Sequence, residues 1–112
     1  MPNLNIENLE EYGLIRAVNH VIEQNIGVGF TPTIFIQIVR RGIAEGDLDI
    51  RISKLVLDVG LLEYLERTIQ QNPRVITIED LIAEKKDGFG LSSEVIRQAK
   101  ARAARFNQIR NN

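Results

Sequence analysis

Residues 48–71 read LDIRISKLVLDVGLLEYLERTIQQ, and the spacing of their apolar side chains decides the predicted fold. One row alternates intervals of four and three residues, with one interruption, which is typical of one face of an α-helix. A second row lies on another side of the same helix. Such a helix is either central in the core or shared with a second copy, and in a domain this small we favour the central position. The first row is Leu48, Ile52, Leu55, Val59, Leu62 and Ile69, and the second is Leu57, Leu61 and Leu65.

Three of the other segments also carry helical signals. Apolar residues at helical spacing predict a helix over about 7–25. Thr77, with Asp80 three residues later, is a variant of the capping box and predicts a short helix that starts at 78. Ser92 or Ser93 can cap a last helix, which continues into the Ala-rich end of the chain.

The segment 33–39 permits two interpretations. Its sequence TIFIQIV alternates apolar residues as a β-strand does, and the same residues also show helical spacing. Thr31 followed by Pro32 is a good helix start, which favours a helix. We therefore predict an all-α fold, a compact bundle of four to five helices with a long central third helix and a basic C-terminal helix. The strand alternative for Thr33 to Val39 stays open.

The composition fits a single helical domain over residues 1–112. Hydrophobic residues make up 44% of the chain, which is too large a share for a disordered protein. The chain has no Cys, which excludes disulfides, thiolate metal sites and a cysteine nucleophile. Because it has no apolar run of membrane-spanning length and does not start like a signal peptide, we expect a cytoplasmic protein without a membrane partner.

Charge is distributed unevenly along the chain. The whole chain has a net charge of −1, but residues 95–112 contain five basic and no acidic side chains, whereas residues 1–94 have a net charge of −6. A basic end on an acidic body suggests a contact with something anionic. The five basic residues, which are the predicted partner-binding residues, are Arg97, Lys100, Arg102, Arg105 and Arg110.

A helical projection places these basic residues around the last helix instead of on one face. Arg97 and Lys100 lie away from the apolar stripe, and Arg105 lies at its flank. Arg102 and Arg110 fall within or beside the stripe, where a docked helix would have to bend them out to solvent. We therefore expect the distal part of this helix, about 102–112, to project from the domain toward another molecule.

Side chains for catalysis or metal binding are scarce. The single histidine, His20, falls opposite the apolar stripe of its predicted helix, so we expect it to face water. Asp47 and Asp49 resemble the start of a calcium loop, but no oxygen ligand follows at the next position. The turn Gly27-Val28-Gly29 lacks the rest of a phosphate-binding loop. We predict no catalytic residue, no metal site and no cofactor.

These observations favour a non-enzymatic binding or adaptor module whose basic C-terminal helix contacts an anionic surface. The partner is an acidic protein or nucleic acid. The short helix from 78 and the basic helix after it follow each other as in a helix-turn-helix, although their connection is longer than usual. The alternative is a self-assembling structural subunit, a homo-oligomer in which the basic helix docks on the acidic body of a neighbouring copy.

Overall fold

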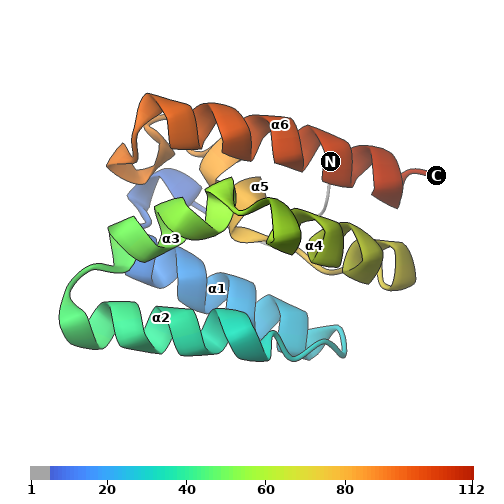
Figure 1. Ribbon diagram of the computed structural model, residues 1–112, viewed down its shortest axis with the longest axis horizontal. Helices are drawn as coiled ribbons and strands as arrows, with labels where there is room; N and C mark the ends of the chain where they lie inside the picture. The colour runs from blue at the N-terminus through green and yellow to red at the C-terminus, as the bar shows by residue number, and fades with distance from the viewer. Residues whose placement is uncertain (1–5) are drawn as a thin grey trace.

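Residues 6–112, the part of the chain that the computed structural model describes, form an all-helical domain without strands (Figure 1). The prediction of an all-α fold is confirmed, and the strand alternative for 33–39 is wrong because these residues open a helix. Within the described range the α-helices number six. They are α1 (Leu14–Gly27), α2 (Thr33–Glu45), α3 (Leu48–Leu57), α4 (Val59–Gln71), α5 (Ile78–Glu84) and α6 (Ser93–Arg110), with the 3-10 turns η1 (Leu9–Glu11) and η2 (Gly88–Gly90).

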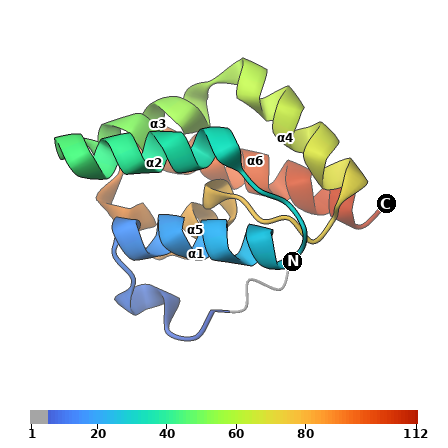
Figure 2. The same cartoon turned by 90° about the horizontal axis from the view of Figure 1, so that it is seen from below.

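The predicted long third helix over 48–71 is wrong, because the chain breaks into α3 and α4 at Asp58. The backbone of Asp58 is extended, with φ −82° and ψ 114°. Its side chain accepts a hydrogen bond of 3.1 Å from the Leu61 backbone N–H, which caps the start of α4. Val59 and Gly60 follow, and both have weak helix propensity. Figures 1 and 2 show the resulting bend between α3 and α4.

The centre of the fold is the short helix α5 and not the segment 48–71. All eight residues from Val75 to Ile82 are buried, and α5 packs against both α1 and α6. Figure 2 shows α5 enclosed by the longer helices. The predicted capping box is confirmed: Thr77 N–H donates to Asp80 Oδ2 at 2.8 Å, and Asp80 N–H donates to Thr77 Oγ1 at 3.2 Å.

A buried amide holds the end of α1 against the segment that leads into α5. The Asn25 side chain donates to the Ile76 carbonyl and accepts from the Ile76 N–H, both at 2.9 Å. The two bonds join positions 51 residues apart in the sequence. They satisfy backbone groups that have no helix or strand partner in this irregular segment.

The expected projection of residues 102–112 does not occur. Phe106 is fully buried and Ile109 is 8% exposed, and both pack with Ile69 of α4 and with Val75. The apolar stripe of α6 therefore stays on the domain to its last turn. Figure 1 shows α6 lying along the body over its whole length.

The first predicted helix is shorter than expected, because η1 and Gly13 precede α1 where a continuous helix from about 7 was predicted. In residues 6–112 we find no helix that is both long and apolar enough to cross a membrane.

Replacing Asn25 by Ala should destabilise the protein strongly. The Asn25→Ala variant leaves the buried N–H and carbonyl of Ile76 unpaired, so we expect the free energy of unfolding to fall by about 2–4 kcal/mol. Urea denaturation measures this change. The control is Asn19→Ala, which alters an exposed amide on the same helix and should cost less than about 0.5 kcal/mol. Equal effects of the two substitutions would contradict the role of Asn25.

Candidate functional site

Two of the five predicted partner-binding residues, Arg102 and Arg110, point into the protein. The Arg110 guanidinium binds both carboxylate oxygens of Asp80, at 3.1 and 2.7 Å, and also donates to the Val75 carbonyl at 2.8 Å. The side chains of Arg110 and Asp80 are 5% and 2% exposed. A bidentate pair of this kind combines charge with fixed geometry. It ties the last turn of α6 to the first turn of α5, so Arg110 is not available to a partner in this structure.

Arg102 lies deeper and contacts three elements. Its Nη2 donates to the Asp58 carbonyl at 2.9 Å, at the break between α3 and α4. Its Nη1 lies 3.5 Å from both the Leu55 carbonyl and Glu79 Oε2, which is at the outer limit of a hydrogen bond. Arg102 therefore places its positive charge at the C-terminal end of α3, where the Leu55 and Asp58 carbonyls also accept backbone N–H groups, and supplies the counter-charge for Glu79.

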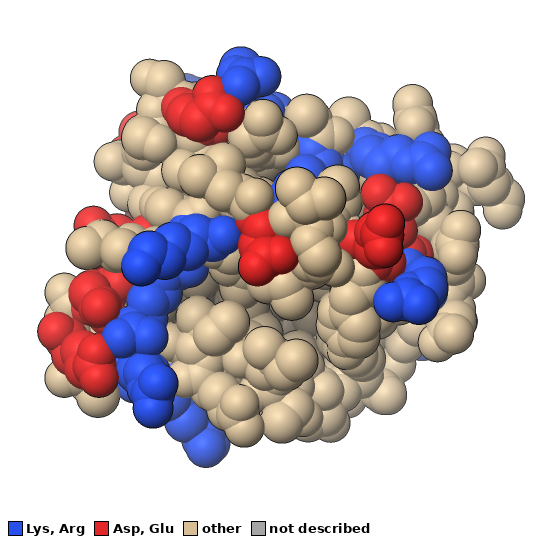
Figure 3. Space-filling view, in the orientation of Figure 1, with Lys and Arg blue, Asp and Glu red and all other residues tan. Residues whose placement is uncertain are grey.

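The other three predicted residues, Arg97, Lys100 and Arg105, are exposed. Arg97 pairs with Glu94 at 2.6 Å on the same helix, and this contact lowers the pKa of Glu94. Arg105 lies 3.8 Å from Glu66 of α4. In Figure 3 the basic side chains over α6 are separated by acidic and uncharged ones and form no continuous patch along that helix. The structure thus does not gather the five basic residues into one surface.

Glu79 is the chemically unusual group that the sequence did not reveal. Its side chain is 0% exposed, on the first turn of α5. Burial is the main cause that raises its pKa to about 7, because an apolar surrounding disfavours the charged form; a hydrogen bond from the residue's own backbone and the charge of Arg102 act in the opposite direction. Within the described residues Oε1 of this carboxyl group has no hydrogen-bond partner. A buried polar atom without a partner calls for an explanation.

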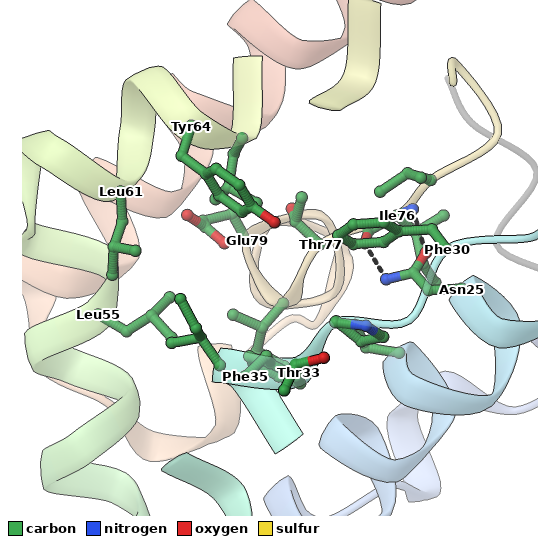
Figure 4. Close-up of a pocket in the computed structure, with 16 residues that line it drawn as sticks. Asn25, Phe30, Thr33, Phe35, Leu55, Leu61, Tyr64, Ile76, Thr77 and Glu79 are labelled. Carbon is green, nitrogen blue, oxygen red and sulfur yellow. Dashed lines mark hydrogen bonds between the residues drawn. The ribbon is translucent and has the colours of Figure 1, made fainter. Parts of the chain in front are cut away.

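Glu79 lines a pocket that lies between α2, α4 and the start of α5 (Figure 4). The pocket has a cavity volume of about 60 Å³ and mostly apolar walls, to which Phe35, Leu55 and Leu61 contribute. In Figure 4 the labelled side chains of Leu55, Leu61 and Phe35 lie around the cavity, which Tyr64 and Glu79 also line. Ile34 and Tyr64, which are 55% and 42% exposed, stand where the pocket meets solvent. An apolar pocket with few polar groups is the usual form of a small-molecule site.

The other candidate groups lie elsewhere and do not join this pocket. His20 was expected to face water; it is instead partly buried, with its ring 6.2 Å from that of Tyr12 in an edge-to-face arrangement. Asp47 pairs with Arg51 at 2.7 Å. Among residues 6–112 no three His, Cys, Asp or Glu side chains stand close enough together to hold a metal ion.

Comparison of the chain with protein-family models, with curated proteins and with solved structures gives no match. The interpretation of the pocket therefore depends on its geometry and chemistry alone.

One sequence signal for Glu79 did exist. Arg102 falls within the apolar stripe of its helix, and an arginine buried by a docked helix requires an acid or carbonyls beside it. The predicted projection of residues 102–112 is one way to keep Arg102 in solvent. To predict that Arg102 turns inward to a buried acid, one must know that α5 is covered on all sides. The spacing of apolar residues along a single helix does not show this.

The buried carboxyl group should make stability depend on pH. Between about pH 4.5 and 7 native Glu79 keeps a proton that the unfolded chain has released. Its contribution to stability is therefore full below pH 4.5 and is lost as the pH rises through 7. We expect the unfolding free energy of the wild type to fall, relative to Glu79→Gln, by on the order of 2 kcal/mol from pH 5 to pH 8.

Urea denaturation at several pH values measures this difference. Glu84→Gln is the control, because Glu84 is an exposed acid on the same helix and its replacement should leave the pH dependence unchanged. A wild type and a Glu79→Gln variant with parallel pH profiles would show that Glu79 titrates normally.

Proposed function

We propose that the protein is a non-enzymatic binding module whose binding site is the pocket between α2, α4 and α5. The observation that carries this proposal is an open, mainly apolar pocket beside the best-buried part of the fold. The ligand is a small, mostly apolar molecule. Its apolar part enters the cavity, and its remainder lies against Ile34 and Tyr64 at the mouth. Figure 3 shows that the surface between α2 and α4 is hollowed and carries mainly uncharged side chains, which suits such a ligand.

The size of the cavity and its polar groups support binding without catalysis. A carboxyl group with a raised pKa in a pocket is a common general acid or base. Here, however, a cavity of about 60 Å³ has no room for a substrate together with a second reactant. The Thr77 hydroxyl, which also lines the pocket, is engaged with Asp80 in the capping box and is not poised as a nucleophile.

The proposals drawn from the basic helix have lost part of their support. In these proposals α6 contacts an acidic protein, nucleic acid or the acidic body of a second copy. Each of them uses all five basic residues of α6. Arg102 and Arg110 are buried in pairs with acids of α5, and Arg97 and Arg105 have acidic neighbours. Among the described residues, Lys100 is the one member of the five that lies near no acidic side chain at ion-pair distance. A contact through α6 therefore remains a weaker proposal than ligand binding in the pocket.

Xenon provides a direct test, because it enters apolar cavities without needing a hydrogen bond. We expect xenon under pressure to shift amide signals of residues that line the pocket, such as Thr33, Leu65 and Ile78, in ¹H–¹⁵N NMR spectra. The Leu61→Phe variant fills the pocket from α4 and should abolish these shifts, at a cost in stability of about 1–3 kcal/mol.

The matched control is Leu57→Phe, since Leu57 lies at the end of α3 outside this pocket and is 44% exposed. This control should respond to xenon like the wild type. Shifts that are spread over the whole protein, or that persist in Leu61→Phe, would rule out the pocket as the binding site.

A further inference from the structure

We infer that two copies of the chain associate through an antiparallel pairing of their α6 helices, in which Glu94 of each copy meets Arg105 of the other. This contact lies outside the pocket between α2, α4 and α5 and does not depend on the proposed function. It also differs from the docking of a basic helix on an acidic body, because it uses an acid and a base on the same face of one helix.

The contact surface on α6 is a stripe of four side chains. Glu94, Gln98, Ala101 and Arg105 follow one another at intervals of four, three and four residues, which places them on one face of the helix. This spacing is the one by which two helices pair along their length. The stripe is separate from the buried side chains of α6, such as Val95 and Phe106, which pack inside the domain.

The stripe lines a groove between α6 and the junction of α3 and α4. Figure 1 shows α6 running past this junction, and α6 packs against both helices. The groove has a volume of about 420 Å³, and Leu57, Val59 and Leu62 give it a mainly apolar surface. Val59, at 72%, is the most exposed large apolar side chain among residues 6–112, and Leu57 is 44% exposed. Exposed apolar side chains that gather in one place mark an interaction surface.

The order of charge along the stripe selects a second copy as the occupant. Glu94 and Arg105 lie at equal distances from the middle of the stripe, and so do Gln98 and Ala101. When two such stripes run antiparallel, Glu94 faces Arg105 at both ends. A parallel arrangement would place like charges together. A two-fold contact requires a surface that is complementary to itself, and the antiparallel stripe meets this requirement.

The middle of the stripe allows the two helices to approach closely. Ala101 is small, and the side chain opposite it in the second copy, Gln98, carries no charge. Leu57 and Val59 lie beside the stripe in the same groove and lose contact with water when the second copy covers it. The removal of this apolar surface from water drives the association, and the charges at the two ends fix its direction and register.

Both charged ends of the stripe are open to a second partner. Glu94 pairs with Arg97 at 2.6 Å and accepts a long hydrogen bond from Gln98 at 3.4 Å. Arg105 lies 3.8 Å from Glu66, which is too far for a hydrogen bond. The side chains of Glu94 and Arg105 are 54% and 53% exposed. Exposed ion pairs contribute little to stability, so exchanging them for contacts with a second copy costs little.

Sedimentation equilibrium of the wild type provides the first test. Because the stripe and its groove form only a small interface, we expect a weak dimer that is detected between about 10 µM and about 1 mM protein. The average mass should rise with concentration from 12.7 kDa toward that of two copies. A mass that stays at 12.7 kDa over this range, or one that grows beyond two copies, would overturn the inference.

Charge reversal tests the antiparallel pairing itself. Glu94→Arg or Arg105→Glu alone places like charges opposite each other at both ends and should weaken association at least about tenfold. An equal mixture of the two variants pairs opposite charges again, so it should form a dimer with one copy of each.

The matched control for this experiment is Lys100→Glu. It makes the same change of charge as Arg105→Glu, at an exposed position of α6 outside the groove, and should associate like the wild type. Single reversals at 94 and 105 that associate as strongly as the wild type, or a mixture that stays monomeric, would contradict the pairing.

An uncharged substitution tests the apolar part of the contact. Val59→Ser changes a side chain that is 72% exposed, so the monomer should fold as before. The dimer should be weakened by about threefold or more, because less apolar surface is buried between the copies. Association of Val59→Ser that equals that of the wild type would show that the groove is not part of the interface.

Discussion

The structure depends on the neutralisation of acidic side chains on α5 by arginines from α6. The segment 75–82 is buried throughout, yet it contains two carboxyl groups, Glu79 and Asp80. Burying unpaired carboxylates is costly, so the acids of a central α5 must be either paired with cations or protonated. Arg102 and Arg110 reach it from one helix, at positions eight residues apart. Contacts inside the protein thus account for two of the five basic residues near the end of the chain.

The same arginines shape the neighbouring elements. Arg102 donates to the carbonyls of Leu55 and Asp58 at the junction of α3 and α4, in addition to the backbone N–H groups of Asp58 and Leu62 that these carbonyls also accept. The break at Asp58 turns α4 away from the line of α3, and the pocket lies beside that turn, with walls from both helices. The two buried acids, Asp80 and Glu79, differ in how closely an arginine holds them, and Glu79 is the one that lines the pocket. Asp80 is held in a bidentate pair with Arg110, whereas the contact of Glu79 with Arg102 is long, at 3.5 Å, and Glu79 Oε1 has no hydrogen-bond partner among residues 6–112.

Local sequence signals predicted the elements well and their arrangement poorly. The all-α class and the capping box at Thr77 follow from residues that are neighbours in sequence, and the structure confirms both. The break at Asp58 was missed because the apolar spacing continues across it. The cap that Asp58 makes with Leu61 is a local signal, whereas the bond from Arg102 to the Asp58 carbonyl spans 44 residues and depends on the folded chain. Glu79 was missed because an acid on a short helix normally faces water.

A double-mutant cycle between Asp80 and Arg110 tests most directly whether α6 neutralises buried acids of α5. Unfolding free energies of the wild type, Asp80→Asn, Arg110→Gln and the double variant give the coupling energy of the pair. For this buried bidentate pair we expect a coupling of about 2 kcal/mol or more. The exposed pair of Glu94 and Arg97 on the same helix should give less than about 0.5 kcal/mol in an equivalent cycle. A coupling between Asp80 and Arg110 as small as that of the exposed pair would contradict an internal role for the basic C-terminal helix.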